Sequence, residues 1–198
     1  DYSGETFSLG VEDHSQYGLK MMGNYTFPSL PYSYMAPGHN SAFVDDDGKL
    51  YIVYHQRFSD MGEMHEPRVH QIFRNKDGWL VAAPFATQGE ELREEGNSSK
   101  EIAGTYYYVN HGTDISAEVH EAEEIQLTAG GKIKDSSGKN IGEFVTEENS
   151  PYITLSTDEG EYEGVLVDME DEAGNPVLCF TAAGENNQSV WGVKYLKE

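Results

Sequence analysis

Short runs of β-branched, aromatic and other apolar residues alternate with glycine-bearing turns along nearly the whole chain. The runs recur at intervals of about ten residues, a spacing typical of short antiparallel strands. Residues 1–35 are less regular, and within them 17–25 is the one strand-like run. The pattern therefore predicts an all-β fold.

Two predicted hairpins organise the first half of the chain. The turns at 45–48 (DDDG) and 75–78 (NKDG) each end in Asp-Gly, which supplies the positive φ that a tight turn needs. They join strands predicted at 41–44, 50–54, 69–73 and 79–82. Residues 39–86 then form a four-stranded antiparallel unit with the size of one β-propeller blade. One blade cannot bury both of its faces alone, so we expect residues 1–90 to need neighbouring blades.

The second half is predicted to form a small barrel. Residues 88–100 are polar and lack apolar periodicity, so we place a linker at 91–100 between domains at 1–90 and 101–198. The strands predicted beyond the linker are 104–110, 124–127, 132–134, 142–146, 152–156, 163–168, 177–181 and 189–196. Eight antiparallel strands in about 100 residues suit a closed barrel, which leaves no exposed edge. The stretch 116–124 fits a short helix by propensity, and a strand edge or a loop fits almost equally well.

Charge narrows the choice of partners. Acidic residues outnumber basic ones 35 to 13, which gives a formal net charge of -22 and argues against nucleic acid and anionic membrane surfaces. A neutral polysaccharide carries no charge to repel, and the 13 Tyr, 8 Phe and 2 Trp offer rings that can pack on sugars. The single cysteine, Cys179, lies in the apolar run 177–180 and is interpreted as a buried structural residue.

His39 is the first candidate for chemistry. Pro37 and Gly38 predict a tight entry to the blade, after which His39 and Asn40 stand at the start of its innermost strand and face the channel of a propeller. On physical grounds alone, a lone histidine is more often a hydrogen-bonded structural residue than a metal ligand.

A second group of basic residues lies on the next two strands. With a period of two, His55 and Arg57 share one strand face, and Arg68 and His70 share a face of the following strand. Carboxylates near them in sequence are Glu63 and Glu66. The group predicts either charge-paired structural contacts or a wall that faces substrate. Structural contacts are favoured for Arg68 and His70, and only slightly so for Arg57.

No catalytic pair of carboxylates is apparent. Hydrolysis of a glycoside needs one protonated and one ionised carboxyl group roughly 5 to 10 Å apart, on either side of the bond. Most acids of this chain stand in turns, such as 45–47 and 158–160, or in the linker, where solvated charge is the ordinary explanation. We therefore expect no catalytic residue in this chain.

Several segments, in order and spacing, resemble the endo-arabinanases of glycoside hydrolase family 43 that carry an extra C-terminal domain. In the first half they are 17–24 (YGLKMMGN), 36–41 (APGHNS), 54–58 (YHQRF), 68–73 (RVHQIF) and 75–79 (NKDGW). In the second half they are 102–112 (IAGTYYYVNHG) and 190–194 (VWGVK). The resemblance covers nearly the whole chain.

The resemblance implies the last part of a five-bladed β-propeller followed by an antiparallel β-barrel, from a secreted bacterial enzyme that cleaves α-1,5-linked arabinan with inversion. It implies that His39 helps to hold a cation, usually calcium, at the propeller centre, and it leaves Asn40, His55 and Arg57 as candidates for substrate binding. The family's catalytic aspartate and glutamate belong to earlier blades. Since the chain begins at Asp1 without a methionine, we expect an upstream propeller half, covalent or separate, as its partner.

Two other interpretations remain open from the sequence. One is a non-catalytic module that binds carbohydrate through Tyr106, Tyr107 and Tyr108, although alternation along a strand prevents all three from facing outward together. Alternatively, the module binds no sugar and only braces the propeller. The other interpretation is a scaffold protein that binds neither metal nor sugar.

Overall fold

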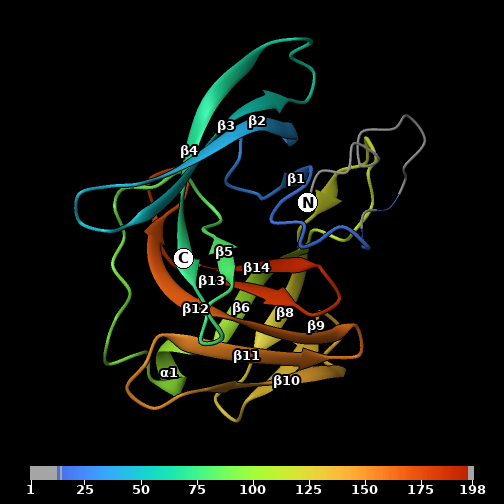
Figure 1. Ribbon diagram of the computed structural model, residues 1–198. Helices are drawn as coiled ribbons and strands as arrows, with labels where there is room; N and C mark the ends of the chain where they lie inside the picture. The colour runs from blue at the N-terminus through green and yellow to red at the C-terminus, as the bar shows by residue number, and fades with distance from the viewer. Residues whose placement is uncertain (1–12, 14, 196–198) are drawn as a thin grey trace.

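The computed structural model describes Asp13 and residues 15–195, so the first and last residues of the two predicted domains lie outside the described part. The described chain forms a six-stranded sheet and a closed barrel of eight strands (Figure 1). This confirms the all-β class and the barrel. No helical segment in the described part combines the length and the apolar character that crossing a bilayer requires.

The first sheet has the strand order β5-β4-β3-β2-β1-β7. Its strands are β1 (Tyr25–Thr26), β2 (Tyr34–Val44), β3 (Leu50–Phe58), β4 (His65–Arg74), β5 (Leu80–Ala82) and β7 (His120–Glu121). The antiparallel unit from β2 to β5 confirms both predicted hairpins, but it begins at Tyr34 and not at residue 39. β7 comes from the second half of the chain and pairs in parallel with β1. The sheet therefore combines residues from both predicted domains.

The barrel is an antiparallel meander that closes where its first strand pairs with its last. Its strands are β6 (Gly104–Asn110), β8 (Glu123–Leu127), β9 (Lys132–Asp135), β10 (Asn140–Thr146), β11 (Tyr152–Thr157), β12 (Gly160–Glu170), β13 (Pro176–Gly184) and β14 (Ser189–Lys194). All eight overlap the strands predicted from the sequence. The stretch 116–124 holds β7 and the start of β8, so its helical alternative is wrong.

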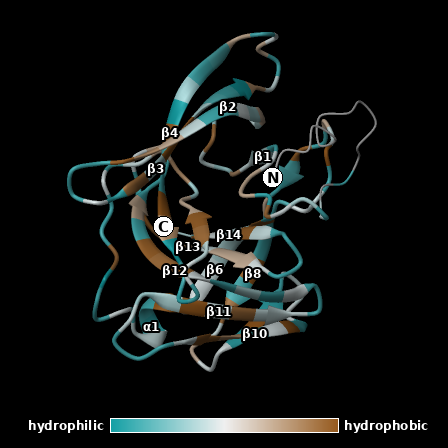
Figure 2. Ribbon diagram, in the orientation of Figure 1, coloured by the Kyte–Doolittle hydropathy of each residue, from teal (hydrophilic) through white to brown (hydrophobic). Residues whose placement is uncertain are grey.

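Alternation along the strands fills the barrel. In β6, Tyr106 is fully buried and packs on Phe180, while the intervening Tyr107 points away from the interior. Other inward side chains include Ile125, Leu155 and the fully buried Ile102, the last residue of α1 (Ser99–Ile102). Figure 2 shows the hydrophobic colour concentrated along barrel strands such as β11 and β12 and along β5.

A second apolar core joins the sheet to the outside of the barrel. Tyr25 and Tyr34 of the sheet are buried in the same cluster as Val109 and Trp191 of the barrel. The rings of Tyr25 and Trp191 meet edge to face with centroids 5.0 Å apart. One face of the sheet is thus covered by the barrel, whereas the loop between β3 and β4 extends away from it at the top of Figure 1.

The run 17–25 was predicted to be strand-like, but only Tyr25 lies in a strand, β1. Segment 17–24 is irregular. It runs across the end of the barrel and is held there by side chains and single backbone bonds. The Ser189 hydroxyl lies 2.7 Å from the carbonyl of Lys20 and 2.8 Å from that of Met21, and Lys20 N donates to the carbonyl of Asn187. The segment thus makes isolated hydrogen bonds to the barrel and no strand ladder.

The end of the predicted linker is helical and not irregular. Ser98 caps α1 and forms a capping box with Glu101, so the helix begins at Ser99 inside the predicted 91–100 range. The division into domains at 1–90 and 101–198 stays a prediction. Cys179 is fully buried, as the sequence predicted, and burial raises the pKa of its thiol well above the usual value.

Candidate functional site

His39 lies in a distorted part of β2. The pairing of β2 with β3 changes register between Met35 and Gly38 and again between Gly38 and Ser41. His39 has φ 49° and Ala36 has φ 45°, left-handed values that are uncommon for residues with a side chain. His39 was predicted to stand at the start of this strand. It lies instead in the irregular middle of β2. Backbone strain of this kind is concentrated at functional sites.

The imidazole of His39 is exposed and lies beside that of His55. Their ring centroids are 5.8 Å apart, and His65 continues the row with its centroid 5.3 Å from that of His55. Gly38 lies next to this pair, and a Cβ there would make an ordinary van der Waals contact of 3.7 Å with Nε2 of His55. Within the described chain, the side chains of His39 and His55 have ring contacts but no hydrogen bond.

Arg57 shares the sheet face of His55, as the period of two predicted. Its guanidinium forms an ion pair of 2.8 Å with Glu63, a carboxylate of the β3–β4 loop. Asn40 is exposed on the neighbouring β2. The structure thus brings His39, Asn40, His55 and Arg57 to adjoining positions of β2 and β3, while their roles remain predictions.

The predicted cation site is incomplete. No group of three or more His, Cys, Asp or Glu side chains in the described part is placed to hold a metal ion. Calcium binds six to eight oxygen ligands, and an imidazole nitrogen alone does not replace them. These residues do not fit a self-contained calcium site, and His39 offers at most one ligand to an ion held mainly by other groups.

Arg68 and His70 lie on the opposite face, against the barrel. Arg68 donates to the Tyr34 hydroxyl and pairs with Glu66 at 2.8 Å. Partial burial lowers the pKa of the Arg68 guanidinium, but these two acceptors outweigh burial and raise the pKa overall. Both partners support the structural role that the sequence predicted for Arg68.

His70 is fully buried and neutral. Its Nδ1 donates to the carbonyl of Ala83 at 2.7 Å, and its Nε2 accepts from the Tyr54 hydroxyl at 3.0 Å. Burial lowers the pKa of His70 to about 4, although the bond to Ala83 opposes the shift. His70 therefore serves the packing of the sheet and does not face solvent.

Two of the segments that carry the family resemblance meet in space. The backbone N–H of Gly23 donates to Nδ1 of His111 at 3.2 Å, and Lys20 pairs with Asp114 at 3.0 Å. Asn24 accepts from Ala36 N at 2.6 Å, two positions before Gly38. The motifs at 17–24 and 102–112 therefore tie the barrel to the start of the distorted part of β2.

The three tyrosines predicted as a sugar platform do not form one. Tyr106 and Tyr108 are on the inner side of β6, where the Tyr106 hydroxyl donates to the carbonyl of Ile102. Tyr107 faces outward and is partly covered by Tyr195, with ring centroids 3.8 Å apart. Alternation along β6 thus turns Tyr106 and Tyr108 inward and leaves Tyr107 as the one tyrosine of the three that faces outward.

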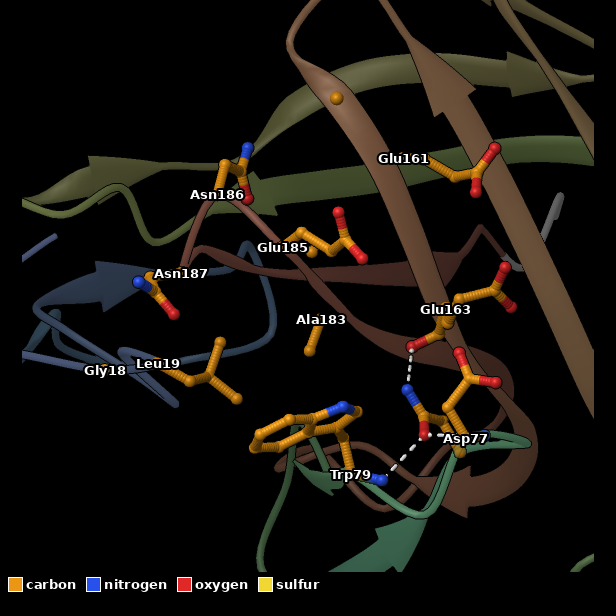
Figure 3. A pocket seen from close by; sticks show the side chains of 13 residues that line it. Gly18, Leu19, Asp77, Trp79, Glu161, Glu163, Ala183, Glu185, Asn186 and Asn187 are labelled. Atoms are coloured by element: carbon orange, nitrogen blue, oxygen red, sulfur yellow. Dashed lines mark hydrogen bonds between the residues drawn. The ribbon is translucent and has the colours of Figure 1, made fainter. Parts of the chain in front are cut away.

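An open cavity of about 660 Å³, which no pattern in the sequence predicted, lies between the first sheet and the barrel (Figure 3). Trp79, at the end of the β4–β5 turn, lines it and exposes 68% of its surface. A tryptophan directly after Asn-Lys-Asp-Gly was visible in the sequence. Its position beside barrel residues 160–163 and 183–187 was not visible, because that neighbourhood arises from tertiary packing.

Comparisons with known proteins point in one direction. Residues 84–192 match the C-terminal lipocalin-like domain of glycoside hydrolase family 43. The extracellular endo-α-(1→5)-L-arabinanase 2 of Bacillus subtilis is 41% identical over 184 residues, covering 90% of this chain and 38% of that protein. The extracellular endo-α-(1→5)-L-arabinanase of Thermotoga petrophila is 38% identical over 192 residues, covering 91% and 39%.

A solved structure shows the same relationship. The crystal structure of a glycoside hydrolase family 43 protein from Bacillus licheniformis superposes with a TM-score of 0.84 at 39% identity. It covers 92% of this chain, which in turn covers 40% of that protein. This chain thus spans about two fifths of the length of each of these relatives.

Proposed function

Because this chain belongs to glycoside hydrolase family 43, whose C-terminal lipocalin-like domain it contains, we propose that it is the C-terminal part of an endo-arabinanase. The observation that carries the proposal is 41% and 38% identity to two extracellular endo-arabinanases across nine tenths of the chain. The substrate would be α-1,5-linked arabinan, and the site of action would be outside the cell. A net charge of -22 does not oppose binding of this neutral polymer.

The proposal places the catalytic carboxylates in an upstream part. An inverting glycosidase needs an acid and a base about 6.5 to 9.5 Å apart, with room for a water between them and the sugar. Near the exposed histidines, the carboxylate of Glu63 is already paired with Arg57. This chain would then contribute part of the wall around the site and would not hydrolyse arabinan alone.

The unpaired edge of β2 and the exposed apolar side chains near its end support the proposal of an upstream partner. β1 pairs with β2 only at Tyr34, so from Met35 to Val44 the described structure places a strand on one edge of β2 only. Phe43 and Val44 expose 46% and 59% of their surfaces near its end. As the innermost strand of a blade, β2 would turn this free edge to the channel that preceding blades enclose, and those blades would pack over its exposed apolar side chains.

His39, Asn40, His55 and Arg57 would face the channel that those blades enclose. His39 would give one ligand to a cation, calcium by family resemblance, whose remaining ligands would be water or upstream groups. Asn40, His55 and Arg57 offer hydrogen-bonding groups suited to sugar hydroxyls. Positive charge on Arg57 is balanced by Glu63, which keeps this wall nearly neutral.

A chimera tests the proposal. The upstream three fifths of the Bacillus subtilis enzyme would be fused to this chain and assayed on debranched arabinan, beside this chain alone. We expect arabino-oligosaccharides from the chimera and none from the chain alone. Turnover by the isolated chain, or a folded chimera with no arabinan activity when the intact Bacillus enzyme is active, would contradict the proposal.

A bracing role for the barrel is compatible with the same structure. The shared core of Tyr25, Tyr34 and Trp191 fixes the first sheet to the barrel. If bracing were the whole role of this half, the barrel would touch no sugar.

A further inference from the structure

Trp79 stands out among the exposed apolar side chains of the described chain. It presents 68% of its surface on the wall of a cavity of about 660 Å³, within the range of roughly 300 to 1,000 Å³ common for small-molecule sites. Leu19 and Ala183 lie beside the indole in Figure 3 and extend its apolar surface. A flat apolar platform of this kind packs on the C–H face of a sugar ring.

The backbone of Trp79 and its turn are held in place before any ligand arrives. The Asn75 side chain accepts from Trp79 N at 2.8 Å and donates to the carbonyl of Glu163 at 3.1 Å. Lys76, in the same turn, pairs with the Glu163 carboxylate at 2.9 Å. The turn is therefore bound to β12 of the barrel by two contacts. Little conformational entropy of the turn remains to be lost when a ligand binds.

Polar groups surround the platform on the barrel side. Asp77, Glu161 and Glu185 are exposed on the rim, and the carboxylates of Asp77 and Glu185 accept no hydrogen bond within the described chain. The side chains of Asn186 and Asn187 complete the rim and are held in place by Tyr162 and by the carbonyl of Ser15. Carboxylates and amides around an aromatic ring match the hydroxyl groups around a sugar.

We propose that this cavity binds a segment of arabinan, with Trp79 as the stacking platform and Asp77 and Glu185 as acceptors for sugar hydroxyls. The choice of arabinan as occupant rests on the proposed function. The cavity itself requires only a neutral polyol with one apolar face. It would hold the polymer on the enzyme while other parts of the chain are cut.

The charge of the rim decides which sugars fit. Four carboxylates line the cavity, those of Asp77, Glu161, Glu163 and Glu185. Of these, the Glu163 carboxylate is paired with Lys76. Uronic acid polymers would place further carboxylates against this rim and be repelled. A metal ion is not the expected occupant, since no metal-holding group of three acidic, histidine or cysteine side chains occurs in the described part.

The intact chain can be tested directly by titration with linear α-1,5-arabino-oligosaccharides. The chain has 2 tryptophans, and Trp191 is fully buried, so a change in tryptophan fluorescence reports on Trp79. We expect a saturable change with arabino-oligosaccharides and none with oligogalacturonates. Calorimetry should show that Trp79→Ala weakens binding about tenfold or more, while Trp79→Tyr retains part of it.

Phe43→Ala is the matched control, because Phe43 is another exposed aromatic residue of the same sheet. It should leave the affinity unchanged. Absence of saturable binding, or equal binding by Trp79→Ala, would overturn the inference. Arabinan hydrolysis by the chimera without binding by the isolated chain would reject the inference alone. Binding by the chain with an inactive chimera would reject the proposed hydrolase instead.

Discussion

The hydroxyl of Thr181 in β13 donates a hydrogen bond of 2.7 Å to the carbonyl of Ala82 in β5, and both residues are buried. This bond crosses from the barrel to the first sheet. It satisfies a carbonyl that would otherwise be sealed from water inside the shared apolar core.

Replacing Thr181 with Val should therefore destabilise the chain by about 1 to 3 kcal/mol, because the Ala82 carbonyl loses its partner inside an apolar environment. Thr181→Ser, which keeps the hydroxyl, is the control. Urea unfolding followed by fluorescence and by circular dichroism should show one shared transition for both signals. An unchanged midpoint for Thr181→Val would contradict the importance of this contact.

Buried His70 should make stability depend on pH. Its pKa is lowered to about 4, so the unfolded chain, with an ordinary histidine pKa near 6.5, binds the proton more readily. Stability is then retained above about pH 6.5 and falls by up to roughly 1.4 kcal/mol per pH unit towards pH 4. Unfolding at pH 7, 6 and 5 would measure this slope, and His70→Asn should reduce it.

His111 contributes in the same direction, since burial lowers its pKa well below the usual value. The slope of the His70→Asn variant should therefore be smaller but not zero. A slope identical to that of the original chain would show that His70 does not titrate on unfolding.

Gly164 permits a close approach of two barrel strands. A Cβ at this position would overlap the carbonyl oxygen of Thr181 and lie 2.5 Å from Cβ of Ala182. Gly164→Ala should cost about 1 to 3 kcal/mol through overpacking. Gly130→Ala is the control, because the nearest atom to its Cβ would be 4.0 Å away. Thermal unfolding of both variants would test this, and equal melting temperatures would refute it.

Val44 lies where an upstream blade is proposed to dock. Val44→Lys should weaken association with the separately expressed upstream part of the Bacillus subtilis enzyme, since docking would bury an unpaired charge. Val145→Lys on the barrel is the control, with 62% exposure against 59% for Val44. Calorimetric titration would compare the two. Equal weakening by both changes would argue against docking at β2.

His39 should matter for activity in the chimera described above. His39→Ala should lower arabinan hydrolysis at least about tenfold if its imidazole helps to hold the cation, an effect of about 1.4 kcal/mol or more. His65→Ala, which removes an exposed histidine at the far end of the same row, is the control. If added calcium restores arabinan hydrolysis by the His39→Ala variant, weakened cation binding is the cause of its lower activity. Equal activity of the two variants would remove His39 from the proposed site.

The amino-acid sequence by itself determined the strands and the barrel. Alternation and Asp-Gly turns located β2 to β5 and all eight barrel strands, because period-two patterns and turn residues act over only a few neighbouring positions. The same local signals failed for 17–24, whose Met21 and Met22 pack against the apolar core without the segment forming a ladder. They left β7 undecided, since 116–124 fitted a helix and a strand edge about equally, and the pairing with β1 makes it a strand.

The tertiary structure alone decided which side chains meet. The ring contact of His39 with His55 depends on the register shifts of β2, which no short pattern announces. Trp79 becomes a platform because Asn75 fixes its turn to Glu163, a residue 88 positions away in the chain. Contacts at such separations arise from packing, and packing depends on all of the elements at once.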